Sequence, residues 1–253
     1  MELLNKLYNK SCEPNYKNYN QISNNIILVN NFFKDFDLAR DFFIKREKWK
    51  CIQYQGHSQP GYITLFPNWI GKSLMEKYIF DNKLIVDKNS YEVQCTFRFL
   101  HNEQQVFSIS NSDYFPHIDD VETQGELMYI CLINLNNTPV STNFYSYKNK
   151  EYCDSKILSE WSDYEKNLNE KIQNFYNKKI FTLNEAKCFL ENQKLNTNLI
   201  KEVNYSPNQA MIYPANLFHS AKVPEEFDEN NYRSVLRIIF CVKNLKQKNI
   251  KYK

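Results

Sequence analysis

The amino-acid sequence predicts an α+β fold that is mainly β, a sandwich or jelly roll with helices before it and a helical insertion inside it. From residue 91 onward, strand-length segments either alternate between apolar and polar residues or are continuously apolar. Turn-forming residues separate these segments, and a polar stretch with helical spacing interrupts them between residues 150 and 200. Many short strands joined by turns are typical of closed or double antiparallel sheets.

The first 90 residues predict two helices and short strands that flank the main sheet. In chain order we expect a strand over residues 25–29, a helix over 36–48, a strand over 49–54, a loop over 55–66 and a helix over 68–80. Asp35 has the position of an N-cap for the first helix, and Leu38, Phe42 and Phe43 share one apolar stripe. The loop is inferred from its glycine and proline residues.

The remaining segments predict the main sheet and its insertion. The expected strands cover residues 91–100, 106–110, 127–135, 141–147, 210–213 and 233–242. Residues 150–204 are expected as a helical insertion, because Trp161, Tyr164 and Leu168 recur at spacings of three and four. The insertion has no linker-like flanks, so we expect a single domain over residues 1–253. Its parts are an N-terminal part over 1–90, a core over 91–149 and 205–245, and the insertion.

The composition of the chain limits which partners and which cellular location are expected. The 253 residues carry a net charge of +3, which argues against a nucleic-acid partner, and the lysine-rich end is expected as a solvated tail. No apolar run approaches the roughly 20 residues needed to span a bilayer, so no membrane partner is expected. None of the seven cysteines forms a Cys-x-x-Cys pair, and the N-terminus lacks the apolar core of a signal peptide. These features favour a reducing, cytoplasmic location. The oligomeric state stays open.

A His-x-Asp pair is the first candidate for a functional site. His117 and Asp119 lie two residues apart, so on a strand both side chains point to the same face. His219 is the candidate for a third ligand, and two histidines with one carboxylate form the facial triad of non-haem Fe(II) oxygenases. His57 or His101 could replace His219, and the plain alternative is a surface turn capped by Asp119.

Two arginines on the last strand are the second candidate. Arg233 and Arg237 are four residues apart and therefore share one face of that strand. Two cations that enter a core need anions to meet them, and an arginine binds a carboxylate through two parallel hydrogen bonds. The alternative is a pair of exposed charges, or salt bridges to the acidic residues between 225 and 228.

Together these motifs resemble the Fe(II)/2-oxoglutarate-dependent dioxygenases, in particular the prolyl-hydroxylase-like group and its uncharacterised bacterial relatives. The resemblance covers about residues 91–245 and is carried by the segments 117–119, 135–136, 142–145, 213–219 and 233–234. It implies a double-stranded β-helix, the jelly roll of that family. It also implies that His117, Asp119 and His219 hold Fe(II). Arg233 would bind the far carboxylate of 2-oxoglutarate. The further candidates for co-substrate contact are Arg237, Asn134 and Thr142.

The implied activity is an oxidoreductase reaction, the hydroxylation of an unactivated C–H bond with release of succinate and CO2. The substrates would be O2 and an amino acid, a peptidyl side chain or a small metabolite. Candidates for substrate contact are Tyr54, His57, Tyr62 and Tyr145, although each aromatic could equally serve ordinary core packing. A non-catalytic metal- or ligand-binding jelly-roll protein is the alternative, and a structural protein with a coincidental triad is a third reading.

Overall fold

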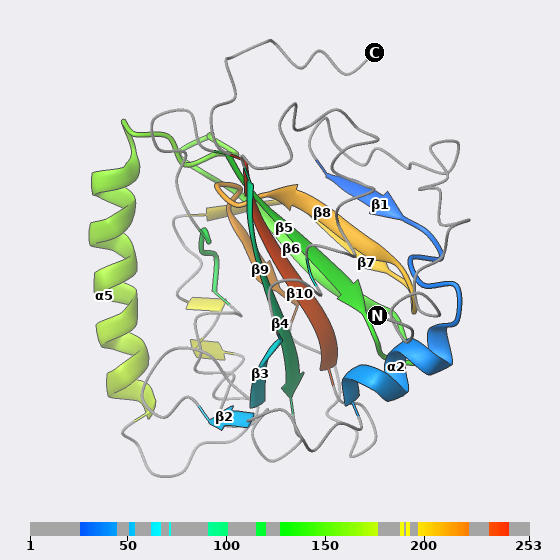
Figure 1. Cartoon of the computed structure of the whole chain (residues 1–253). Coiled ribbons are helices and arrows are strands. Elements are labelled where there is room, and N and C mark those ends of the chain that lie inside the picture. The colour runs from blue at the N-terminus through cyan, green and yellow to red at the C-terminus, as the bar shows by residue number, and fades with distance from the viewer. Residues whose placement is uncertain are drawn as a thin grey trace.

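The structure is a computed structural model that describes residues 26–44, 51–53, 62–66, 71, 91–100, 115–119, 127–176, 188–189, 191–192, 197–222 and 233–242. These residues form two antiparallel sheets and two helices (Figure 1). In chain order the elements are β1 (Ile27–Val29), α2 (Phe36–Ile44), β2 (Cys51–Gln53), β3 (Tyr62–Phe66), β4 (Tyr91–Leu100), β5 (Leu127–Asn134), β6 (Val140–Tyr147), α5 (Leu158–Tyr176), β7 (Thr197–Tyr205), β8 (Ala210–Pro214), β9 (His219–Ala221) and β10 (Arg233–Val242).

The larger sheet has seven strands in the order β1-β8-β5-β10-β4-β3-β2. All of its pairings are antiparallel, and β10 lies between β5 and β4, with Arg237 opposite Leu132 on one side and Thr96 on the other. Both faces of β5 are buried from Tyr129 onward, which explains why its sequence is continuously apolar. The prediction of a mainly β chain built from antiparallel sheet is confirmed.

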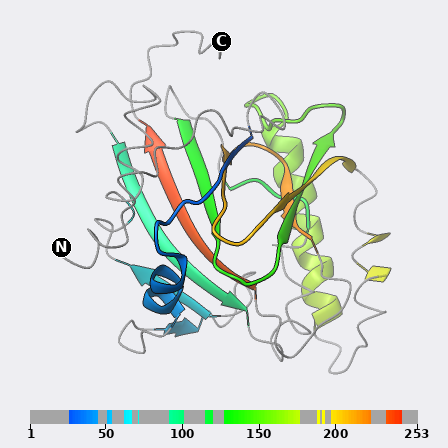
Figure 2. The ribbon, with the colours of Figure 1, turned by 90° about the vertical axis from the view of Figure 1, so that its right-hand side faces the viewer.

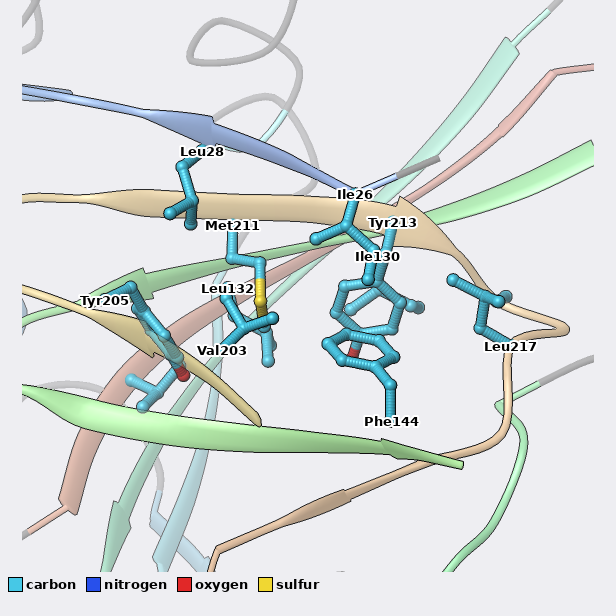
Figure 3. Packing of buried hydrophobic residues seen from close by; sticks show 12 residues of the cluster. Ile26, Leu28, Ile130, Leu132, Phe144, Val203, Tyr205, Met211, Tyr213 and Leu217 are labelled. Atoms are coloured by element: carbon cyan, nitrogen blue, oxygen red, sulfur yellow. The ribbon is translucent and has the colours of Figure 1, made fainter. Parts of the chain in front are cut away.

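The smaller sheet has three strands in the order β7-β6-β9, and its inner face packs on the larger sheet. Figure 3 shows this core, in which Phe144 and Tyr205 of the smaller sheet meet Leu132 and Tyr213 of the larger one. Side chains alternate along a strand, so Val140, Thr142 and Phe144 share the inner face of β6. The outer face of β6 carries Tyr145 and Tyr147, which pack with Trp161 of α5.

The two helices begin where side-chain oxygens can cap them. Asp35 Oδ1 accepts a hydrogen bond from the N–H of Leu38 at 2.9 Å, as expected for the N-cap of α2. Asp154 Oδ1 accepts from the N–H groups of Lys156 and Ile157 just before α5. Helix α5 lies along the outside of the smaller sheet (Figure 2). Among the described residues, neither helix combines the length and the apolar composition needed to cross a membrane.

Two expected boundaries are wrong. Residues 62–66 were expected in a loop, but they form β3, which pairs with β4 at the side of the larger sheet. Residues 197–204 were expected in the helical insertion, but they belong to β7, so the insertion ends before Thr197. The expected strand over 106–110 and most of the expected helix over 68–80 lie outside the described residues.

Candidate metal centre

Backbone hydrogen bonds bring two distant segments of the chain together. His117 and His219 form an antiparallel bridge, in which each N–H donates to the other residue's carbonyl at 2.9 Å. Two residues further on, the N–H of Asp119 donates to the carbonyl of Ala215, also at 2.9 Å. The three predicted ligands are therefore fixed at the level of the backbone, by pairing across about 100 residues of intervening chain.

Their side chains converge as well. The candidate ligand atoms of His117, Asp119 and His219 all lie within 4.8 Å of one another, and the two imidazole rings are 4.4 Å apart. His219 is buried, whereas His117 and Asp119 are partly buried. The structure thus brings together all three residues that the sequence predicted as metal ligands.

Both histidines are held in the tautomer that a metal requires. Nδ1 of His117 lies 2.8 Å from the carbonyl oxygen of Phe115, and Nδ1 of His219 lies 2.8 Å from that of Leu217. A carbonyl oxygen only accepts, so each Nδ1 carries a hydrogen and donates it. In the neutral ring, Nε2 is then left with a free lone pair. Such a hydrogen bond from the second ring nitrogen is the usual support of a ligating histidine.

One contact between two of the candidate ligands is compatible with a bound cation. Nε2 of His219 lies 3.2 Å from Oδ2 of Asp119. If the ring is neutral, two acceptor atoms face each other and repel, unless a cation lies between them or the ring takes up a proton. Two imidazole nitrogens and one carboxylate are a donor set that fits Fe(II) with open coordination positions.

Arg237 adds a positive charge beside the triad. Its guanidinium donates a hydrogen bond to Oδ1 of Asp119, and both side chains are largely buried. Burial alone would raise the pKa of Asp119. The nearby Arg237 charge is the largest of the effects that outweigh burial, and it holds that pKa well below its ordinary value. Asp119 is therefore an anion, as a metal ligand must be.

Two buried hydroxyls lie on the smaller sheet without a hydrogen-bond partner among the described residues. Thr142 Oγ1 lies on the inner face of β6, and the side chain of Thr142 is 1% exposed. The hydroxyl of Tyr205 belongs to the core between the sheets. Buried hydroxyls are normally paired, so an unpaired one indicates a missing polar partner. The sequence predicted Thr142 as a residue that contacts the co-substrate, and that role stays a prediction. Tyr205 was not among the residues that the sequence predicted for the site. Its burial follows from β7, a strand that the sequence did not predict.

Asn134 has another role than the one expected from the sequence. Its Nδ2 donates to the carbonyl oxygens of Thr138 at 2.9 Å and Tyr205 at 3.1 Å, and its Oδ1 accepts from the N–H of Asn136 at 2.8 Å. Both amide hydrogens are thus used inside the protein, one in the loop after β5 and the other at the end of β7. We therefore assign Asn134 to that loop and not to a co-substrate.

Two of the four predicted substrate residues, Tyr145 and Tyr62, lie in described strands. Tyr145 packs on the α5 side of β6, and its hydroxyl lies 3.0 Å from Ser220 Oγ, so it does not line the core between the sheets. Tyr62 lies in β3, where it pairs with Phe99. Tyr54 and His57 lie outside the described residues, as do His101 and the acidic residues 225–228.

Arg233 is the first residue of β10, and its Cα pairs with that of Leu100 in β4. It lies four residues before Arg237 on the same strand. Its role as the carboxylate clamp stays a prediction.

The fold can be compared with solved structures. The crystal structure of the Kdo hydroxylase KdoO, described as a non-heme Fe(II) alphaketoglutarate dependent dioxygenase, is 14% identical, with a TM-score of 0.36. That alignment covers 69% of this chain and 59% of KdoO, less than two thirds of the latter. A Pseudomonas putida prolyl-4-hydroxylase is 9% identical, with 88% of this chain and 95% of that chain covered and a TM-score of 0.41. EvdO2 from Micromonospora carbonacea var. aurantiaca is 6% identical, with 88% of each chain covered and a TM-score of 0.43.

Sequence comparison identifies the family without naming an activity. No curated protein matches the sequence. Residues 11–234 match the model of a family described as "Family of unknown function (DUF6445)", a segment that contains the metal-centre candidates His117, Asp119 and His219. Because the match covers well over half of its residues, the chain belongs to this family of unknown function, DUF6445.

Proposed function

We propose that the chain is an Fe(II)- and 2-oxoglutarate-dependent dioxygenase that hydroxylates an unactivated C–H bond and releases succinate and CO2. The observation that supports this most strongly is the convergence of His117, Asp119 and His219, with both Nδ1 atoms turned to backbone carbonyls. A surface turn capped by Asp119 would not bring a histidine 100 residues away into the same group. The sequence resemblance described above points to the same reaction class.

The three ligands would each contribute through one atom. His117 and His219 would bind through Nε2, because each Nδ1 is engaged with a carbonyl oxygen. Asp119 would bind as a carboxylate, with the Arg237 guanidinium keeping its other oxygen in place. The chemistry that Fe(II) supplies when bound is the activation of O2, coupled to decarboxylation of 2-oxoglutarate and insertion of one oxygen atom into a C–H bond.

The co-substrate would lie in the polar part of the core between the two sheets. Arg237 and Thr142 face this core from opposite sheets, because their strand neighbours Val235 and Phe144 both belong to it. Arg233 would bind the far carboxylate, since Arg237 already contacts Asp119 beside the metal. The unpaired Thr142 hydroxyl would donate to the same dianion. Apolar neighbours such as Ile130 and Leu132 would keep water away from it.

We further propose that the two sheets form a double-stranded β-helix within one domain over residues 1–253. The substrate would be an amino acid, a peptidyl side chain or a small metabolite, and the protein would act in the cytoplasm. Tyr54, His57 and Tyr62 stay candidates for substrate contact.

The proposal is tested by anaerobic titration with Fe(II) and then 2-oxoglutarate. We expect a weak visible charge-transfer band in the wild type and none in His117→Ala. Lys148→Ala is the control: it shortens an exposed side chain and should leave the band unchanged. Succinate release that is lost in Arg233→Ala would support the clamp. Metal binding without the band or succinate would instead favour the non-catalytic binding protein.

A further inference from the structure

The insertion between β6 and β7 contacts, through its first residues, the segment that leads to His219. The N–H of Cys153 donates to the carbonyl of Asn216 at 2.9 Å, and the N–H of Phe218 donates to the carbonyl of Glu151 at 3.2 Å. Residues 151–153 therefore run beside the segment that ends at His219. That segment is held between the insertion on one side and the His117–Asp119 segment on the other.

Side chains of the insertion reach the neighbours of the ligands. Trp161 of α5 is fully buried, and its ring centroid lies 4.5 Å from that of Phe218, the residue before His219. Ile118, the residue between His117 and Asp119, packs against the same cluster of Tyr145, Tyr147, Cys153, Trp161 and Phe218. One aromatic side chain on α5 thus lies at the centre of a cluster that holds a neighbour of every proposed ligand.

A second contact involves the later part of the insertion. Phe115, which is 1% exposed, meets Phe189 edge to face, with ring centroids 6.0 Å apart and an interplanar angle of 78°. The carbonyl of Phe115 is the acceptor for Nδ1 of His117. The residue that orients one histidine is therefore itself anchored by the insertion.

These contacts should affect the affinity for the metal, because a metal site needs its ligands held within about half an ångström of the productive geometry. We propose that the described part of the insertion, residues 150–176, 188–189 and 191–192, is a positioning element for the candidate metal centre, with Trp161 as its central residue. This inference rests on the proposed metal site. Trp161 would act through neighbours of the ligands: it packs on Phe218, which precedes His219, in a cluster against which Ile118 also packs.

The test compares two losses of packing on the same helix. Trp161→Ala and Leu168→Ala both empty buried positions of α5, but Leu168 lies seven residues further on, about 10 Å along the helix axis. Affinity for Co(II) is measured by its visible absorption in folded protein, and stability by urea denaturation without metal. We expect Trp161→Ala to weaken Co(II) binding about 10-fold to 100-fold, the range for residues that support ligands. Leu168→Ala should lower stability and leave the affinity within about 2-fold.

A conservative variant covers the case in which Trp161→Ala does not fold. Trp161→Phe retains an aromatic ring against Phe218 and should show a smaller loss of Co(II) affinity with an altered absorption band. Equal affinity in wild type, Trp161→Phe and any folded Trp161→Ala would overturn the inference, and so would an equal loss in Leu168→Ala. Failure of the wild type to bind Co(II) would instead refute the metal site on which the inference rests.

Discussion

Arg237 on β10 is paired with Asp119, which lies 118 positions earlier in the sequence. Their side chains are 15% and 12% exposed, so the pair is shielded from water. A buried carboxylate needs a positive partner, and a divalent cation bound by the triad would interact with the same carboxylate. Arg237 and the metal would therefore share one anion, the Asp119 carboxylate. Each should change how much the other stabilises the folded protein.

Arg237→Gln should make the metal-free protein less stable and more responsive to metal. Removing one partner of a buried ion pair costs about 3–5 kcal/mol, because the other charge is left unpaired. A divalent cation would replace the lost positive charge, so Co(II) should stabilise Arg237→Gln more than it stabilises the wild type. Urea denaturation with and without Co(II) measures this. The control is Lys222→Gln, which breaks the more exposed pair with Glu202. Equal stabilisation of wild type and Arg237→Gln by Co(II) would contradict the shared anion.

Thr142→Val should separate stability from co-substrate binding. The substitution keeps the shape of the side chain and removes a buried hydroxyl that has no partner in the described structure, so stability should stay unchanged or rise by up to about 1 kcal/mol. If that hydroxyl donates to 2-oxoglutarate, a hydrogen bond to a charged group is lost. Binding should then weaken about 10-fold to 100-fold. Calorimetric titration in the presence of metal measures the affinity, and Thr138→Val, in the exposed turn, serves as control. Unchanged affinity in Thr142→Val would remove the residue from the site.

Asn134→Ala should have the opposite pattern. It removes three hydrogen bonds, two within the loop after β5 and one to Tyr205 of β7, so the free energy of unfolding should fall by about 1–3 kcal/mol. The affinity for 2-oxoglutarate should not change, because both amide hydrogens are used inside the protein. Asn137→Ala is the matched control, since Asn137 is an exposed residue of the same loop. A selective loss of 2-oxoglutarate binding would restore Asn134 to the role that the sequence suggested.

The grouping of the three candidate ligands could be predicted largely from sequence, because its signal is local. His-x-Asp on an extended segment sends both side chains to one face wherever the segment lies, and one histidine in an apolar strand region completed the set. The face of β6 that lines the core could not be predicted in the same way. Residues 142–147 are all buried, so alternation separates Thr142 from Tyr145 without showing which of them faces the metal centre. The packing of α5 decides this, and it is a tertiary effect.

Strands β3 and β7 were missed for a related reason. Most of β7 has exposed or half-buried side chains, including Leu199 and Ile200, and its pairing with β6 shifts register between Phe144 and Tyr145. A strand of this kind has no clear period of two, and its partner determines its conformation. Strand β3 is defined by its pairing with β4 and β2.

The cluster beneath α5 predicts a loss of stability in alkali. Burial, with the charges of Asp154 and Glu165, raises the pKa of the Cys153 thiol from 9.0 to about 11. Burial, with the charge of Tyr147, raises the pKa of Tyr164 from 10.0 to about 12. Above pH 9 the unfolded chain therefore releases protons that the folded chain still holds. Since stability falls with pH wherever the unfolded state binds fewer protons, these two groups should destabilise the fold progressively between about pH 9 and pH 12.

Cys153→Ala tests this dependence. The free energy of unfolding of the wild type should fall from neutral pH to about pH 10, and the fall should be smaller in Cys153→Ala, because one of the two proton-retaining groups is gone. Cys188→Ala removes an exposed thiol and should leave the slope of the wild type unchanged. Urea denaturation at a series of pH values measures all three proteins. The same slope in Cys153→Ala and wild type would show that the Cys153 thiol ionises as readily in the folded chain as in the unfolded one, and that the packing around Trp161 admits water.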